Sequence, residues 1–306
     1  MSFPVLASTF ANNILPIILL SAAGFALGRL LHIDARSLGR VVFYVFSPVL
    51  IFDLLIQNQL NISEAVVVIA FAFSFILVMG LVALVTGYFL KLERTALIAI
   101  LITTMFANTG NYGLPLVSFA FGEQALSYAG IYFVTTTFLF YTLGVFLASL
   151  GHMSIKEAIL GLFRIPTMHA VWLAVIINTW NVQIPEPIMR SIDLAAGGTI
   201  PVMLILLGVQ LTRVEFSGNL RALQLSVSLR LLIAPLAALL FAALFGMQGF
   251  TRQGSVTQAS MPSMVSATVL ATEYDLDAKL VTAVVFISTL LSPLTLTPLL
   301  VFLGRP

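Results

Sequence analysis

Long apolar segments alternate with short polar connections along the whole sequence. A helix needs about 20 apolar residues to cross the ~30 Å hydrocarbon core of a bilayer, and about ten segments meet this requirement. Their residue ranges are 11–31, 38–57, 64–90, 95–121, 125–150, 167–182, 189–211, 219–246, 253–272 and 278–303. The pattern predicts an all-α polytopic membrane protein with about ten transmembrane helices.

The fourth of these segments is interrupted by polar and glycine residues, because residues 108–115 read Asn-Thr-Gly-Asn-Tyr-Gly-Leu-Pro. Gly110 and Gly113 allow backbone conformations that other residues avoid, and Pro115 suits the first turn of a new helix. Unwound backbone in hydrocarbon persists only where protein or a polar cavity receives its unpaired groups. The segment therefore predicts an unwound turn that lines a pathway, followed by a new helix with Pro115 in its first turn.

The ninth segment contains a similar interruption at residues 258–266, Gln-Ala-Ser-Met-Pro-Ser-Met-Val-Ser. A helix start exposes unpaired N–H groups and the positive end of the helix dipole, so two starts that meet in mid-membrane favour an anion such as a carboxylate. The alternative is a pair of proline kinks that only shape packing. The predicted substrate-binding residues are Asn108, Thr109, Gly110, Asn111, Gly113, Pro115, Ser260, Pro262, Ser263 and Ser266.

Two pairs of prolines indicate an internal repeat. Pro48 in the second range corresponds to Pro201 in the seventh, and Pro115 in the fourth corresponds to Pro262 in the ninth. Because each half would contain an odd number of spans, the halves would be inverted relative to each other. We expect a first five-helix repeat in residues 1–151, an amphipathic cytoplasmic linker in 152–166 and a second five-helix repeat in 167–306.

The composition excludes several classes of protein. With 60% hydrophobic and 8% charged residues, the chain has too little polar surface for a soluble globule. A net charge of +2 does not indicate a nucleic-acid partner. The absence of cysteine excludes thiolate chemistry. The three histidines, His32, His152 and His169, lie far apart in the sequence, so we expect neither a metal site nor a cofactor.

The distribution of basic residues predicts the orientation. Ten of them lie in odd-numbered connections: Arg29, Arg36, Arg40, Lys91, Arg94, Lys156, Arg164, Arg213, Arg221 and Lys279. The positive-inside rule then places both termini outside a cell (inner) membrane. No basic residue precedes the apolar run of residues 1–10, so we expect no cleaved signal peptide.

Two ionisable residues lie inside predicted spans. Burying a charge costs at least ~2.5 kcal/mol on insertion scales, so such residues persist mainly for function or pairing. Arg230 is a candidate for binding an organic anion, with an ion pair or hydrogen bonds to carbonyls as the alternative. Asp53 is a candidate for proton coupling, with proximity to water at a helix end as the alternative. The small residues Gly24 and Gly28 predict close helix packing.

Residues 108–115, in the fourth of ten predicted helices, resemble the motif of the auxin efflux carrier family, which includes plant auxin exporters and bacterial organic-acid carriers. The resemblance covers essentially the whole chain in length and helix layout. It implies a fold similar to that of bile acid/sodium symporters, with broken fourth and ninth helices that cross. Helices one, two, six and seven would form a scaffold, and helices three to five and eight to ten would form a mobile transport domain.

By the same resemblance, Asn108, Asn111, Pro115 and Pro262 match the crossing that holds the substrate. Plant members dimerise through scaffold helices, which implies a homodimer. The long hydrophilic loop of many plant members is here only the short linker, so the phosphorylation control found there is not expected.

These features predict a secondary transporter in the lipid bilayer that moves a small organic anion, an auxin-like carboxylate or a dicarboxylate, by alternating access and in the direction of efflux. A sodium- or proton-coupled importer and a ligand-sensing receptor on a transporter fold are the alternatives. An enzyme is not expected, because the sequence has no His-Glu-x-x-His or Gly-x-Ser-x-Gly motif.

Overall fold

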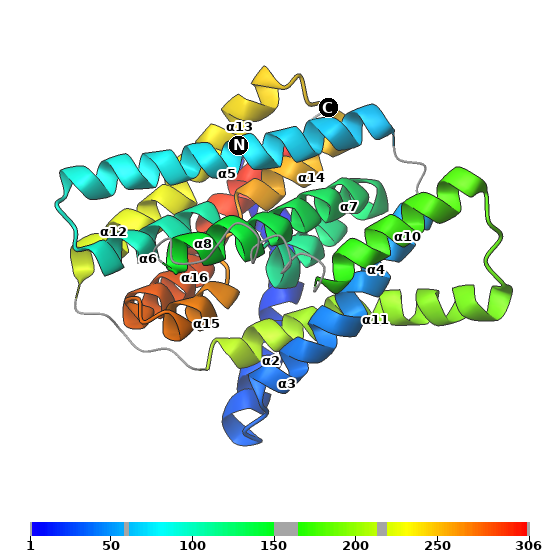
Figure 1. Cartoon of the computed structure of the whole chain (residues 1–306), viewed down its shortest axis with the longest axis horizontal. Coiled ribbons are helices and arrows are strands. Elements are labelled where there is room, and N and C mark those ends of the chain that lie inside the picture. Colours follow the sequence, from blue (N-terminus) through cyan, green and yellow to red (C-terminus); the bar gives the residue numbers. More distant parts are fainter. Residues whose placement is uncertain (1, 58–60, 150–164, 213–218, 305–306) are drawn as a thin grey trace.

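The computed structural model describes residues 2–57, 61–149, 165–212 and 219–304 (Figure 1). Almost all of these residues are helical, and the one β-bridge among them joins Ala107 and Ser263. The predicted amphipathic linker lies mostly outside the described residues. The polytopic all-α class is thus what the structure shows.

Helical elements overlap every predicted range, and π-helical turns (η) interrupt several of them. The first half contains α1 (Phe3–Thr9), η1 (Phe10–Ile14), α2 (Leu15–Leu30), α3 (Ala35–Val41), η2 (Val42–Phe46), α4 (Ser47–Gln57), α5 (Ile62–Phe89), α6 (Arg94–Met105), η3 (Thr109–Gly113), α7 (Leu114–Leu139), η4 (Phe140–Gly144) and α8 (Val145–Ala148). The second half contains α10 (Pro166–Trp180), α11 (Glu186–Gln210), α12 (Leu220–Ser228), η5 (Leu229–Ile233), α13 (Ala234–Leu244), α14 (Gly249–Ala259), α15 (Ser266–Glu273) and α16 (Ala278–Leu303).

Seven continuous helical stretches, counted with their π-helical turns, are long and apolar enough in the described residues to cross a membrane. The number is lower than the predicted ten because the fourth and ninth ranges are broken and α10 has only 15 residues. In addition, the stretch Thr109–Ala148 combines two predicted spans, which separate at Gly122, where φ is 74° and ψ is −168°. The ten-helix inverted repeat stays a prediction.

The first helix starts at Phe3, well before the predicted residue 11. The polar residues Asn12 and Asn13 lie within this helix, in η1. There the side-chain amide of Asn13 donates to the carbonyl of Thr9 at 2.9 Å, so the helix itself satisfies this polar group.

Side chains of polar residues cap four of the helices. Asp34 accepts from backbone amides at the start of α3, Asn61 at the start of α5, Asn219 at the start of α12 and Asp277 at the start of α16. Such caps satisfy amide groups that have no partner within the helix. They explain why these helices begin directly after short connections.

The contacts between helices can be described in two groups. We call residues 3–57 and 166–210 the scaffold group, in which α2 and α4 pack on α11 and α10 packs on α4. We call residues 62–148 and 220–303 the crossing group, in which α14 and α5 pack on α7 and α6 packs on α5. Figure 1 shows α4, α10 and α11 together on one side of the molecule. The groups meet where η3 and α7 contact α11 and α4, and where α16 contacts α1.

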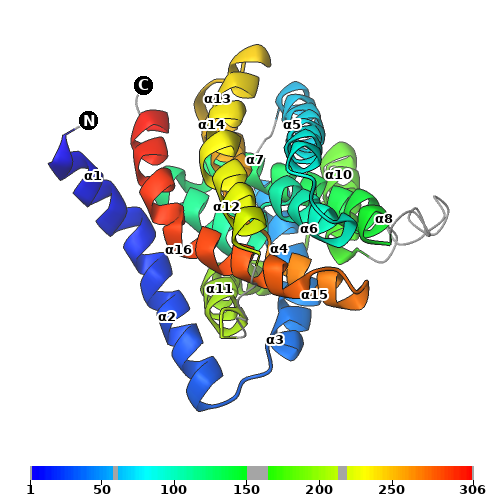
Figure 2. The ribbon, with the colours of Figure 1, turned by 90° about the vertical axis from the view of Figure 1, so that its left-hand side faces the viewer.

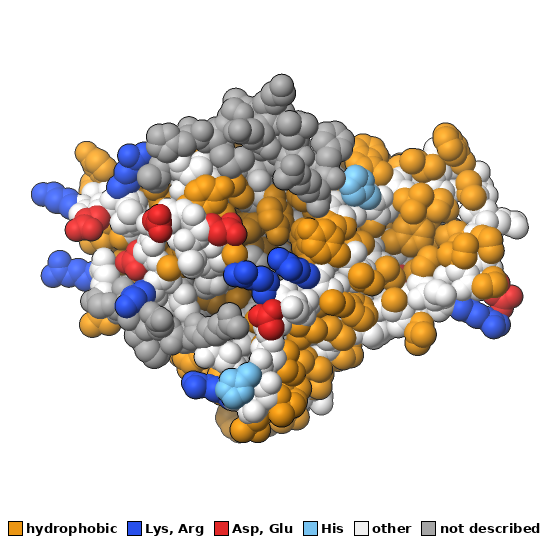
Figure 3. Space-filling model, turned by 60° about the horizontal axis from the view of Figure 1, so that its bottom comes forward, with side chains coloured by type: hydrophobic (Ala, Val, Ile, Leu, Met, Phe, Trp, Pro, Cys, Tyr) orange, Lys and Arg blue, Asp and Glu red, His pale blue; other side chains and the backbone are white. Residues whose placement is uncertain are grey.

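The surface and the termini agree with a membrane protein. Figure 2 shows both termini at the same end of the molecule. Figure 3 shows a face with broad hydrophobic areas, on which most of the charged side chains gather toward one end. Large apolar side chains such as Trp172, Leu194 and Leu236 are exposed, as expected for residues that face lipid.

Candidate functional site

Two helices of the crossing group are interrupted, and their interruptions lie against each other. The first interruption falls between α6 and η3 at residues 106–108, and the second between α14 and α15 at residues 260–265. Ala107 and Ser263 form an antiparallel β-bridge between them. We call residues 106–113 and 260–266 together the crossing.

Backbone hydrogen bonds hold the two interruptions together. The amide of Asn108 donates to the carbonyl of Pro262 at 2.8 Å, and the amide of Met264 donates to the carbonyl of Phe106 at 3.0 Å. Each unwound segment thus supplies hydrogen-bond partners for backbone groups that have none within the other segment. This pairing explains how extended backbone persists inside the helix bundle.

Helical turns after the first interruption begin before Pro115. η3 begins at Thr109, and Pro115 follows as the second residue of α7. The turn before Pro115 is wide: the amide of Gly113 donates to Asn108 at 3.0 Å and that of Leu114 donates to Thr109. In a regular α-helix the ring of Pro115 would clash with the carbonyl four residues earlier, that of Asn111, and the wider π-helical turn relieves this clash. Pro115 thus lies in the first turn of α7, as predicted, and the helical turns before it begin at Thr109.

Gly110 and Gly113 allow close packing rather than an unusual backbone conformation. Neither has a positive φ, and Gly113 is helical with φ −68° and ψ −48°. A Cβ on Gly113 would overlap the side-chain oxygen of Gln258, and a Cβ on Gly110 would lie 3.0 Å from the ring of Phe133. The predicted conformational role of these glycines is wrong, and a steric role replaces it.

The first turn after each interruption presents backbone amides without acceptors. Gly110, Asn111 and Tyr112 donate to no described carbonyl outside their own helix. Val265 and Ser266, at the start of α15, also lack such a bond within the described residues. A first-turn amide has no partner inside its own helix. Two helix N-termini with unused N–H groups therefore lie at the crossing, an arrangement that favours a negative charge.

Buried polar side-chain atoms add to these amides. Asn108 is 4% exposed and its Nδ2 has no hydrogen-bond partner among the described residues, and the same holds for Oγ1 of the fully buried Thr109. Further unpaired atoms belong to α6, α7 and α14: those of Thr104, Thr136, Thr137, Ser255, Thr257 and Gln258. An unsatisfied buried polar group costs about 1–3 kcal/mol. Asn108 and Thr109 therefore have unused hydrogen-bonding capacity for a polar guest.

The three predicted serines differ in whether their hydroxyl hydrogen is already donated to a carbonyl. Ser260 donates its hydroxyl to the carbonyl of Val256 at 2.7 Å, and Ser263 donates to that of Thr103 at 2.8 Å. Each hydroxyl has one hydrogen, so these two are committed to holding the second interruption in place. Ser266 is exposed at the start of α15.

Arg230 is fully buried and holds both interruptions. Its Nη1 donates to the carbonyl of Thr104 at 3.0 Å, at the end of α6. Its Nη2 and Nε donate to the carbonyls of Ala259 at 2.5 Å and Met261 at 2.6 Å, at the end of α14. These carbonyls form the negative ends of two helix dipoles. The structure thus supports the carbonyl alternative for Arg230.

Asp53 takes part in a hydrogen-bond network between α4 and α11. The side-chain amide of Gln57 donates to Asp53 at 2.6 Å and to Asp193 of α11 at 3.1 Å. No described hydrogen bond joins these residues to either interruption. The network is confined to the scaffold group.

The structure adds one residue that the sequence did not single out. Nδ2 of Asn111 donates to Oε1 of Gln210, the last residue of α11, at 3.2 Å. Both side chains are partly exposed. A glutamine at the end of an apolar span is typical of an interfacial residue, so the local sequence gave no sign of this contact.

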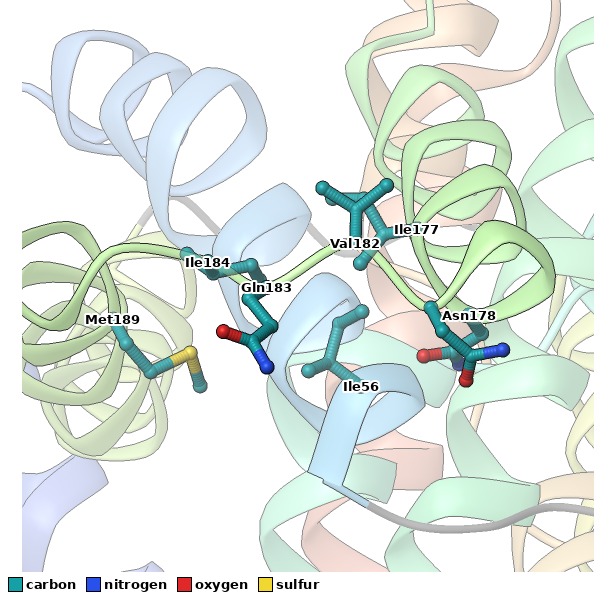
Figure 4. Close-up of a pocket in the computed structure, with 8 residues that line it drawn as sticks. Ile56, Ile177, Asn178, Val182, Gln183, Ile184 and Met189 are labelled. Carbon is teal, nitrogen blue, oxygen red and sulfur yellow. The ribbon is translucent and has the colours of Figure 1, made fainter.

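A surface pocket of about 470 Å³ lies at the connection between α10 and α11 (Figure 4). Ile56, Asn178 and Gln183 are among the residues that line it, and none of the predicted site residues does. This pocket belongs to the scaffold group and is separate from the crossing.

Comparison with known proteins agrees with the geometry. Residues 9–300 match the family described as "Membrane transport protein". The chain is 31% identical over 290 residues to an uncharacterized transporter of Methanothermobacter thermautotrophicus, which covers 93% of this chain and 94% of the relative. It is 25% identical over 276 residues to an uncharacterized transporter of Methanocaldococcus jannaschii, which covers 88% of this chain and 90% of the relative.

Proposed function

Because the chain belongs to the auxin efflux carrier family of membrane transport proteins, we propose that it carries a small organic anion across the cell membrane by alternating access. The anion is an auxin-like carboxylate or a dicarboxylate, and the direction is efflux. The crossing group moves against the scaffold group and exposes the crossing to each side in turn.

The observation that supports this proposal is the set of unused donors at the crossing. Backbone amides of Gly110, Asn111 and Tyr112 lack described acceptors, and Nδ2 of Asn108 is buried without a partner. A carboxylate is a charged acceptor, and hydrogen bonds to it are roughly twice as strong as those between neutral groups. Arg230 donates to carbonyls at the negative ends of α6 and α14, so the positive ends of η3 and α15 are not offset by these dipoles.

The interface between the two groups suits relative motion. Ile51 and Leu54 of α4 and Leu206 of α11 pack in one apolar cluster with Leu114 and Val117 of α7. Apolar contacts have no fixed direction, so they tolerate sliding better than a network of hydrogen bonds.

Counterflow in proteoliposomes tests the proposal. Vesicles loaded with unlabelled indole-3-acetate or succinate should take up the labelled compound faster than protein-free vesicles. A ligand-sensing receptor would bind the label without moving it, and uptake that requires an imposed sodium or proton gradient would identify a coupled importer. If the protein neither binds nor moves any carboxylate in a wider screen, the proposal is wrong.

A further inference from the structure

Hydrogen bonds between helices divide the described residues into the scaffold group and the crossing group. In the scaffold group, Thr199 of α11 donates to the carbonyl of Phe46 at 3.3 Å, and Asn178 of α10 donates to that of Leu55 at 2.9 Å. In the crossing group, Arg230 and Ser263 make bonds of the same kind between helices. Each group is therefore held together by its own polar contacts.

One hydrogen bond joins the two groups, among those with both partners in the described residues. It is the bond from Nδ2 of Asn111, in the crossing, to Oε1 of Gln210, in the scaffold group. The neighbouring contacts between the groups are apolar, as in the cluster of Ile51, Leu206 and Leu114. Among the described residues, the single hydrogen bond between the groups thus occurs at the turn that carries the unused amides.

The chemistry of the pair allows it to open. Gln210 ends α11 and is partly exposed, so solvent reaches the pair. Asn111 donates to a neutral amide oxygen, which is a weaker acceptor than a carboxylate. A carboxylate at the crossing would therefore compete with Gln210 for the same donor.

We propose that Gln210 is a positioning residue that accepts the hydrogen bond of Asn111 in the empty carrier. When the substrate binds, Asn111 donates to its carboxylate instead of to Gln210. This inference rests on the proposed function. Binding of the anion removes the one hydrogen bond that joins the groups within the described residues, so the loaded carrier moves more readily than the empty one. Exchange of substrate for substrate should then be faster than net release, because only net release requires the empty carrier to move.

Transport by a Gln210→Leu variant tests this coupling. Vesicles preloaded with labelled succinate or indole-3-acetate release it either into buffer or in exchange for the unlabelled compound. Loss of one neutral hydrogen bond should raise the ratio of net release to exchange about two- to tenfold. Gln253→Leu is the matched control, because Gln253 is also partly exposed but donates to Leu303 within the crossing group. An unchanged ratio in Gln210→Leu, or loss of exchange, would overturn the inference.

A second measurement needs no substrate. Hydrogen exchange at the amides of Thr109 and Gly113, the two in this turn that donate to described carbonyls, should be faster in ligand-free Gln210→Leu than in the wild type and in Gln253→Leu. Equal exchange rates would mean that Gln210 does not hold this turn. If the wild type binds and moves no carboxylate, the proposed function fails, whereas the exchange rates still decide whether Gln210 restrains Asn111.

Discussion

Arg230 shows how a charge inside a membrane protein can be structural. Its three hydrogen bonds end on carbonyls of the two broken helices, where the backbone has lost its usual partners. The sequence could place a buried cation in the eighth span but left substrate binding and carbonyl bonding open. The position of Arg230 beside both helix ends favours bonding to carbonyls, and this position follows only from the fold.

Arg230→Met should therefore destabilise the protein strongly. Each hydrogen bond from a charged group contributes about 1.5–3 kcal/mol, so loss of all three should lower the free energy of unfolding by at least about 3 kcal/mol. Thermal unfolding of the purified protein in detergent checks this. Arg252→Met is the control, because Arg252 stacks at 5.1 Å on the ring of Phe302 and is partly exposed. Equal midpoints for the two variants would contradict the structural role.

The predicted site residues were found by their chemistry, but several act differently from the prediction. Pro115 and Gly113 marked the interruption correctly, since Gly113 ends the π-helical turn η3 and Pro115 lies in the first turn of α7 directly after it. Their roles depend on Gln258 and on where the helix resumes, and these follow from contacts across the fold. A local motif does not contain such contacts.

Among the elements, the pair α2 and α11 depends on the closest packing. A Cβ on Gly24 would overlap the carbonyl of Ile205, and a Cβ on Gly208 would overlap the carbonyl of Ser21. The packing role predicted for Gly24 is confirmed. Its partner Gly208 was not predicted, because a single small residue in an apolar span does not reveal which helix lies against it.

Gly208→Ala should push α2 away from α11. The added methyl group meets backbone, which cannot rotate away as a side chain can, so we expect a lower unfolding midpoint and reduced membrane yield. Gly197→Ala in the same helix has no atom within 4 Å of the added Cβ. That control should be neutral or more stable by about 0.5–1 kcal/mol. A Gly208→Ala protein as stable as this control would rule out the tight contact.

At the scale of the whole molecule, hydropathy predicted the positions of the helices well, and the polar interruptions predicted where two of them break. The pairing of Asn108 with Pro262 joins segments far apart in sequence, so no local pattern could give its hydrogen bonds. Gln210 was missed for the same reason. The inverted repeat and the outside position of the termini stay predictions.

The central claim is that the crossing binds the anion, and equilibrium binding to Asn111→Ala tests it most directly. Titration of the purified protein with the carboxylate that shows counterflow should give an affinity at least about tenfold weaker than the wild type, because a charge-assisted donor is lost. Gln210→Leu breaks the same hydrogen bond but keeps the donor, so it should bind at least as tightly as the wild type. The unfolding midpoint of Asn111→Ala should stay near that of the wild type. Wild-type affinity in a folded Asn111→Ala protein would show that the anion binds elsewhere.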